Sequence, residues 1–168
     1  LRLTEVTGPG TVRGYVTGTF GQPTVFFDSS RGSQSRPIAL PPAAHTHMSW
    51  AFSQPGRYEL GFAAAVKTDD GERPLAAERF SVLVGGSPDD VAAVAGRKLL
   101  DKGHADITAD LDQGELYIWA DEAGGGEHTQ RVYPVSSTTI HVPPKALAEI
   151  PADPSFRFLG QPGTQVYQ

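Results

Sequence analysis

The chain has 168 residues and no cysteine, which excludes disulfides, thiolate metal sites and cysteine nucleophiles. A formal charge of −5 without a run of basic residues argues against nucleic acid or an anionic membrane surface as the main partner. No apolar run approaches the roughly 18 residues of a membrane span. Because the chain begins at Leu1, we expect a processed or excised fragment of a longer protein.

Residues 1–86 alternate short apolar segments with turn residues, in a chain that contains 19 Gly and 14 Pro. The turns include Gln54-Pro55-Gly56 and Asp69-Asp70-Gly71. Between the turns we expect short strands, over residues 11–17, 24–28, 46–52, 57–67 and 75–84. This pattern predicts a mainly β fold, with an immunoglobulin-like β-sandwich module over residues 1–86.

A different pattern begins after residue 86. Ser87 is a candidate N-cap, Pro88 takes the first helical position, and Val91, Val94 and Leu99 follow at helical spacing. We therefore expect a connecting helix over residues 87–102, ending at Gly103.

Residues 103–168 return to strand-like alternation. We expect strands over 104–111, 115–121, 131–135 and 138–142, followed by an irregular tail from 151 to 168 that is mobile near its end. In the second of these strands Leu116, Ile118 and Ala120 oppose Tyr117 and Trp119. This second β portion is either complete or part of a neighbouring module.

A His-x-His pair precedes and enters the strand predicted over 46–52. His45 and His47 fall on one face, opposite Met48 and Trp50, because successive strand side chains point to opposite faces. Their Cα atoms are about 7 Å apart, so both imidazoles can reach one metal ion. The alternative is a pair of exposed strand histidines beside a turn. Zinc requires further ligands, since it takes four, or three and a water.

His104 and Asp106 are the candidates for the remaining ligands. With His104 the site is of the three-histidine type, suited to Zn²⁺ and, as the alternative, Cu²⁺. Asp106 lies on the same strand face as His104, where it is either a fourth ligand or a carboxylate that orients an imidazole. The competing interpretations are a histidine at a helix C-terminus for His104 and a solvated carboxylate for Asp106.

Several segments resemble the actinobacterial surface-anchored repeat proteins associated with metal ABC transporters, often described by a choice-of-anchor M domain. The most specific is the string His45-Thr46-His47 through Trp50-Ala51-Phe52 to Pro55-Gly56-Arg57-Tyr58. Supporting segments are Val6-Thr7-Gly8-Pro9-Gly10, Gly18-Thr19-Phe20-Gly21-Gln22-Pro23-Thr24-Val25-Phe26-Phe27-Asp28-Ser29, Gly103-His104-Ala105-Asp106-Ile107 and Phe158-Leu159-Gly160. The resemblance implies a secreted or cell-surface protein that handles metal or adheres, with a metal ABC transporter component or its binding protein as a candidate partner.

The order of two segments departs from that family. There the segment like Gly103 to Ile107 opens a module and the His-x-His segment lies toward its end, whereas here the order is reversed. The fragment is then expected to hold the end of one module and the start of the next. His104 would meet His45 and His47 either by a fold-back between modules or by module exchange in a homodimer.

Catalysis has little support in the sequence, which has no Gly-x-Ser-x-Gly elbow, no phosphate-binding glycine loop and no His-Glu-x-x-His helix. We therefore predict a binding protein, not an enzyme: an extracellular module that binds zinc and is accessory to metal uptake. Two alternatives are a cell-surface adhesion or scaffolding module with structural histidines, and a glycan-binding module that uses Tyr117 and Trp119 as a platform.

Overall fold

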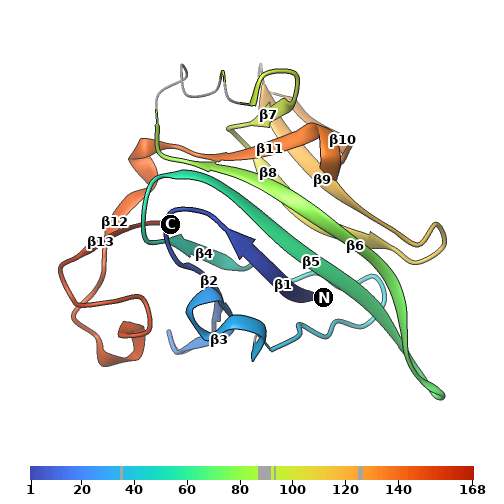
Figure 1. Ribbon diagram of the computed structural model, residues 1–168, viewed down its shortest axis with the longest axis horizontal. Helices are drawn as coiled ribbons and strands as arrows, with labels where there is room; N and C mark the ends of the chain where they lie inside the picture. Colours follow the sequence, from blue (N-terminus) through green and yellow to red (C-terminus); the bar gives the residue numbers. More distant parts are fainter. Residues whose placement is uncertain (35, 87–91, 93, 125–126) are drawn as a thin grey trace.

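The computed structural model describes residues 1–34, 36–86, 92, 94–124 and 127–168. The predicted mainly β fold is confirmed (Figure 1). No helix among the described residues is long and apolar enough to cross a membrane. In chain order the strands are β1 (Arg2–Thr7), β2 (Val12–Thr17), β3 (Pro23–Asp28), β4 (Ser49–Phe52), β5 (Gly56–Thr68), β6 (Gly71–Val84), β7 (Lys98–Leu100), β8 (His104–Asp110), β9 (Glu115–Gly124), β10 (Glu127–Pro134), β11 (Thr138–Val142), β12 (Leu147–Glu149) and β13 (Gln165–Tyr167). The short 3₁₀ helices are η1 (Ser29–Gln34), η3 (Val135–Ser137), η4 (Pro144–Ala146) and η5 (Pro154–Phe156).

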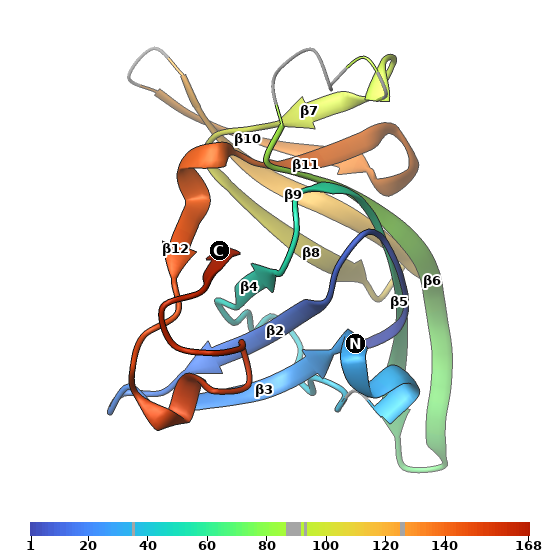
Figure 2. The same ribbon diagram turned by 60° about the vertical axis from the view of Figure 1, so that its left-hand side comes forward.

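These strands form three sheets. The long sheet has the order β1-β5-β6-β11-β7, the facing sheet the order β12-β13-β4-β2-β3, and the side sheet the order β10-β9-β8. Pairs between described strands are antiparallel, except that β11 pairs in parallel with both β6 and β7. Figure 1 shows β5 and β6 running the length of the molecule, and Figure 2 shows β2, β3 and β4 across from them.

Aromatic side chains join the long sheet to the facing sheet. Phe62 of β5 is fully buried and makes edge contacts with Phe27, Trp50 and Phe80, with ring centroids 5.5, 5.9 and 5.5 Å away. Phe27 and Trp50 also stack on each other at 5.6 Å. Such ring pairs contribute about 0.5–1.5 kcal/mol each beyond the apolar area they bury. This cluster therefore fixes the spacing of the two sheets at the point where β4 begins.

The predicted boundary at residue 86 separates strands that share sheets. β11 lies between β6 and β7 in the long sheet, and β13 pairs with β4 in the facing sheet. One core cluster also joins Phe62 and Phe80 to Leu116, Ile118 and Val135. The described strand pairs within residues 1–86 are antiparallel, as in an immunoglobulin-like sandwich, but the long sheet also contains the parallel strand β11 from residues 138–142.

The connecting helix predicted over 87–102 is wrong where the structure describes that range. Residues 87–91 and 93 lie outside the described residues, but Lys98–Leu100 form β7 and pair with β11. Leu100 is only 6% exposed and belongs to the core. Gly96 has a φ of +88°, a left-handed backbone that typically ends a helical segment. Strand pairing and the burial of Leu100 thus outweigh the helical spacing of the apolar residues.

The C-terminal tail, predicted to be irregular, has turns and irregular structure around η5, but its end forms β13 and packs against the facing sheet. β13 pairs with β12 and β4. Leu159 and Val166 are buried beside Tyr15 in a second apolar cluster, and the side-chain amide of Gln168 donates to the Tyr15 hydroxyl at 2.5 Å. Tertiary burial therefore orders a segment whose Pro and Gly content suggested a loop.

The side sheet confirms the alternation predicted for residues 104–121. Leu116, Ile118 and Ala120 of β9 are buried. Tyr117 and Trp119 lie on the opposite face of that strand, where they are half-buried.

The Phe62→Ala variant is expected to lose about 3–5 kcal/mol of unfolding free energy, because it leaves a cavity among three packed rings. Urea unfolding followed by circular dichroism measures the loss. Phe20→Ala is the matched control: Phe20 is 94% exposed, so the same truncation is expected to change stability by less than about 0.5 kcal/mol. Equal losses in the two variants would contradict the central role given to Phe62.

Candidate functional site

The segment that carries His45 and His47 leads into β4 but is not itself a strand. The strand predicted over 46–52 begins only at Ser49, which pairs with Tyr15 of β2. Residues 44–48 have no regular secondary structure, and the pairing of β4 with β2 ends at Ser49. The alternation argument therefore does not apply to His45 and His47, although the segment still brings the two imidazoles together.

Packing at Met48 and Trp50 anchors this segment. Both side chains are partly buried against the main core. Gly14 of β2 lies directly beneath them, because a Cβ at that position would meet Met48 Sδ at 2.8 Å and Phe27 Cδ2 at 2.8 Å. The absence of a side chain at Gly14 thus allows the chain to approach β2 closely just after His47.

His104 comes to the same place from the other half of the chain. It is the first residue of β8 and follows Gly103, whose φ of +88° turns the chain out of the β7–β8 connection. Because β7 is fixed by its parallel pairing with β11, the start of β8 is fixed too.

The structure brings the three predicted histidines together within one chain. The ring centroids of His45 and His47 are 5.3 Å apart, with ring planes inclined by 52°. Those of His47 and His104 are also 5.3 Å apart, with an inclination of 37°. His47 therefore lies between the other two, and neither module exchange nor a second chain is needed for the rings to meet.

Asp106 is the fourth predicted residue, and it contacts His104. Its Oδ1 lies 3.0 Å from Nε2 of His104. The His104 side chain is 44% exposed and that of Asp106 is 28% exposed. When Nε2 donates its hydrogen to the carboxylate, Nδ1 keeps its lone pair and is the ring nitrogen able to bind a metal ion.

The three imidazoles are neighbours without forming a ready chelate. Among the described residues, no group of three or more His, Cys, Asp or Glu side chains is arranged so that it could hold a metal ion. All three histidines are exposed at the surface. They form an accessible cluster of nitrogen donors, and the carboxylate of Asp106 contacts one of them, His104.

The two other histidines lie apart from this cluster. His141 of β11 is half-buried, with Nε2 3.2 Å from the carbonyl oxygen of Gly85. The side chain of His128 lies outside the described residues.

A charged cluster that the sequence does not reveal ties β7 to the side sheet. Lys98 Nζ donates to Glu122 Oε2 at 2.9 Å and lies 5.2 Å from the centroid of the Tyr133 ring. The Tyr133 hydroxyl donates to the other oxygen of Glu122. The hydrogen bonds from Tyr133 and then Lys98 lower the pKa of Glu122, and the bond to Glu122 raises the pKa of Lys98. These contacts connect the strand before His104 to β9 and β10.

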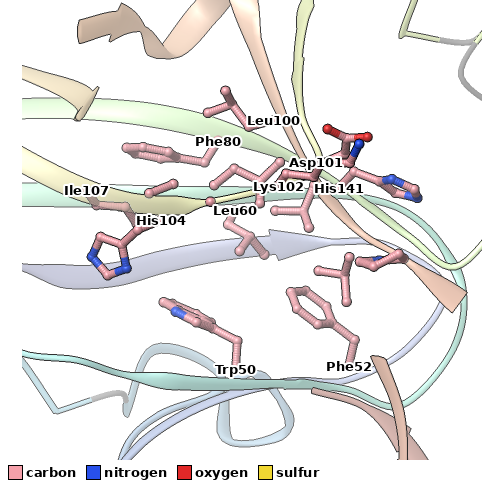
Figure 3. Close-up of a pocket in the computed structure, with 16 residues that line it drawn as sticks. Trp50, Phe52, Leu60, Phe80, Leu100, Asp101, Lys102, His104, Ile107 and His141 are labelled. Atoms are coloured by element: carbon pink, nitrogen blue, oxygen red, sulfur yellow. The ribbon is translucent and has the colours of Figure 1, made fainter. Parts of the chain in front are cut away.

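A pocket of about 350 Å³ opens between the sheets beside His104. Figure 3 shows Trp50 and Phe52 of the facing sheet across from Leu60, Phe80 and Leu100. The lining comes from β4, β5, β6, β7, β8 and β11, from the β7–β8 connection and from Pro143 after β11. Sequence patterns gave no sign of this pocket, because it exists only where these distant strands meet.

Comparisons of this chain with protein-family models, with curated proteins and with solved structures each find no match.

Proposed function

We propose that the chain binds a zinc ion through His45, His47 and His104, with Cu²⁺ as the alternative ion, as an extracellular module accessory to metal uptake. The observation that carries the proposal is the pair of 5.3 Å separations that link the three imidazole rings. His104 lies more than fifty residues from His45 and His47 in the sequence, so local chain geometry does not account for its meeting them.

Two of the three ring separations, His45 to His47 and His47 to His104, match those of histidines that share a zinc ion. With Zn–N bonds of about 2.0–2.1 Å, each ring centroid lies roughly 3.2 Å from the metal, and a tetrahedral angle then separates two centroids by roughly 5.2 Å. The two observed separations are 5.3 Å. All three side chains are exposed, and the proposal requires them to rotate about their side-chain bonds so that their nitrogens face one ion.

Asp106 supports the same assignment. A metal-bound histidine usually donates its second ring N–H to a carboxylate or carbonyl, which fixes the tautomer and makes the other nitrogen more basic. The contact between His104 Nε2 and Asp106 Oδ1 has this form. We assign Asp106 to the orientation of His104, and the fourth coordination position to water or to a ligand from a partner.

The donor set favours zinc over other ions. Imidazole suits Zn²⁺ and Cu²⁺, whereas Mn²⁺, Mg²⁺ and Ca²⁺ prefer oxygen ligands. The absence of cysteine removes the thiolates that complete most closed structural zinc sites. A site of three exposed imidazoles is open to solvent, which suits capture and release of an ion more than permanent structural zinc. Handover to a metal ABC transporter component or its binding protein fits this openness and the family resemblance.

Replacing His47 by Ala is expected to weaken zinc binding at least about a hundredfold, since the central imidazole of the three is lost. Isothermal titration calorimetry of the chelator-treated protein with zinc measures the affinity, and elemental analysis measures the metal retained after purification. His45→Ala and His104→Ala are expected to weaken binding in the same direction.

The matched control is His141→Ala, which removes an imidazole outside the cluster and is expected to leave zinc affinity unchanged. Retained affinity in His47→Ala, or a wild-type protein that takes up no zinc or copper, would favour the adhesion interpretation with structural histidines.

Asp106→Ala is expected to weaken zinc binding by about ten- to a hundredfold, because His104 loses the carboxylate that orients its ring. The same titration measures the change. Asp112→Ala removes an exposed carboxylate near the far end of the strand, just beyond β8, and serves as the control for the loss of one negative charge. If both substitutions weaken binding equally, the effect is general electrostatics and the positioning role of Asp106 is contradicted.

A further inference from the structure

We propose that the site binds metal together with a small apolar molecule, which coordinates the ion through a nitrogen donor and lays its apolar body in the pocket between the sheets. This inference rests on the proposed zinc site and names the ligand class for its fourth coordination position. Among the described residues, His104 is the one that belongs both to the histidine cluster and to the pocket lining.

The histidine cluster and the pocket meet at His104. Figure 3 shows this residue at one end of the pocket, and its ring centroid is 5.3 Å from that of His47. An ion bound to a ring nitrogen of His104 is about 2.0–2.1 Å from that nitrogen, so it lies at the same end of the pocket. Three histidines leave a zinc ion one position for a further ligand. A donor in that position has the pocket beside it for its remaining atoms.

The walls of this pocket are core residues. Phe52, Leu60, Phe80, Val82 and Leu100 line it, and each is at most 6% exposed. The volume of about 350 Å³ is at the lower end of the range of about 300–1,000 Å³ that is typical of ligand pockets. Protein cores contain few voids larger than a water molecule, because unfilled space forfeits dispersion contacts. The body of the ligand is therefore small and apolar.

The charged groups of the rim do not select a charged ligand. Lys102 and Asp101 are both exposed at the end opposite His104, where their charges oppose each other (Figure 3). His141 at that end lies within hydrogen-bond distance of a backbone carbonyl, and Asp106 contacts His104 at the other end. What distinguishes the His104 end is its metal donors, so coordination selects the head group. A neutral nitrogen donor suits both Zn²⁺ and Cu²⁺.

Strand β8 offers a matched pair of alanines for locating the ligand. Ala105 is exposed and lines the pocket. Ala109 lies on the same face of the same strand and is also exposed, but it is not part of the lining. A larger side chain at the first position narrows the pocket, and the same side chain at the second does not.

The probe is 1-phenylimidazole, titrated calorimetrically into metal-free protein and into protein loaded with zinc, or with copper if the chain takes up that ion instead. The titration is done at about pH 8, where imidazoles are neutral. The loaded protein is expected to bind this probe at least about tenfold more tightly than 1-methylimidazole, because a phenyl ring buries more apolar surface than a methyl group.

Two further comparisons test coordination. Loading with metal is expected to raise the affinity for 1-phenylimidazole at least about tenfold, and by linkage the probe raises the affinity for the metal by the same factor. The compound 1-phenylpyrrole has the same shape but no nitrogen lone pair free for a metal ion. Its affinity is expected to be the same with and without metal.

The alanine pair places the phenyl ring. Ala105→Phe is expected to lower the ratio of the affinities for 1-phenylimidazole and 1-methylimidazole at least about fivefold, whereas Ala109→Phe leaves this ratio unchanged. The ratio cancels any change in the metal site itself, because both compounds have the same donor. Circular dichroism and thermal unfolding check that each variant is folded.

The failure of this inference is distinguishable from that of the proposed function. A chain that takes up neither zinc nor copper contradicts both. Metal uptake with equal affinity for the two imidazoles, with an equal gain for 1-phenylpyrrole, or with an unchanged ratio in Ala105→Phe overturns this inference alone.

Discussion

The contact of Phe62 with Phe27, Trp50 and Phe80 is the interaction on which the rest of the structure depends. It holds the facing sheet against the long sheet and sets the position of Trp50 at the start of β4. His47 is only three residues before Trp50, and Met48 between them packs over Gly14. The aromatic core therefore determines where the His45–His47 segment lies, even though the segment itself is exposed and has no strand partner.

A second constraint brings His104 to that segment. The parallel pairing of β7 with β11 holds Leu100 in the core and so fixes the start of β8 only four residues later. The cluster of three imidazoles is thus the product of two long-range arrangements, an aromatic contact between sheets and a parallel strand pair. Exposed side chains placed by buried elements keep their freedom to rotate, which an exchangeable metal site requires.

The sequence predicted the parts of the fold that are determined locally. The β5–β6 hairpin follows from Asp69-Asp70-Gly71, where Gly71 adopts a φ of +123°, and the β8–β9 hairpin from Gln113-Gly114, where Gly114 has a φ of +73°. Both turns need a glycine at one position, and the residues on either side alternate. Signals of this kind depend only on neighbours in the chain.

The strands that were missed depend on distant partners. β7, β12 and β13 have three residues each, too few for an alternation pattern, and they exist because they complete sheets started elsewhere. β1 has six residues and was also missed; it forms the edge of the long sheet by pairing with β5. The same limit applies to the candidate site. Residue types and spacing singled out His45, His47, His104 and Asp106, but whether His104 joins the pair within one chain depends on where β11 inserts. The pocket has no local signal at all, because each strand contributes only a few residues to it.

The strand β8 contributes both to the histidine cluster and to the pocket between the sheets. Asp106 is paired with Trp119 on the outward face, whereas Ile107 is paired with the buried Ile118 and lines the pocket. Alternation along one strand thus directs polar donors toward the surface and apolar side chains toward the hollow between the sheets. His104 belongs to both, as a neighbour of His47 and as part of the pocket lining. Since a single backbone segment carries both sets of side chains, the same core contacts that place the imidazoles also keep the pocket open.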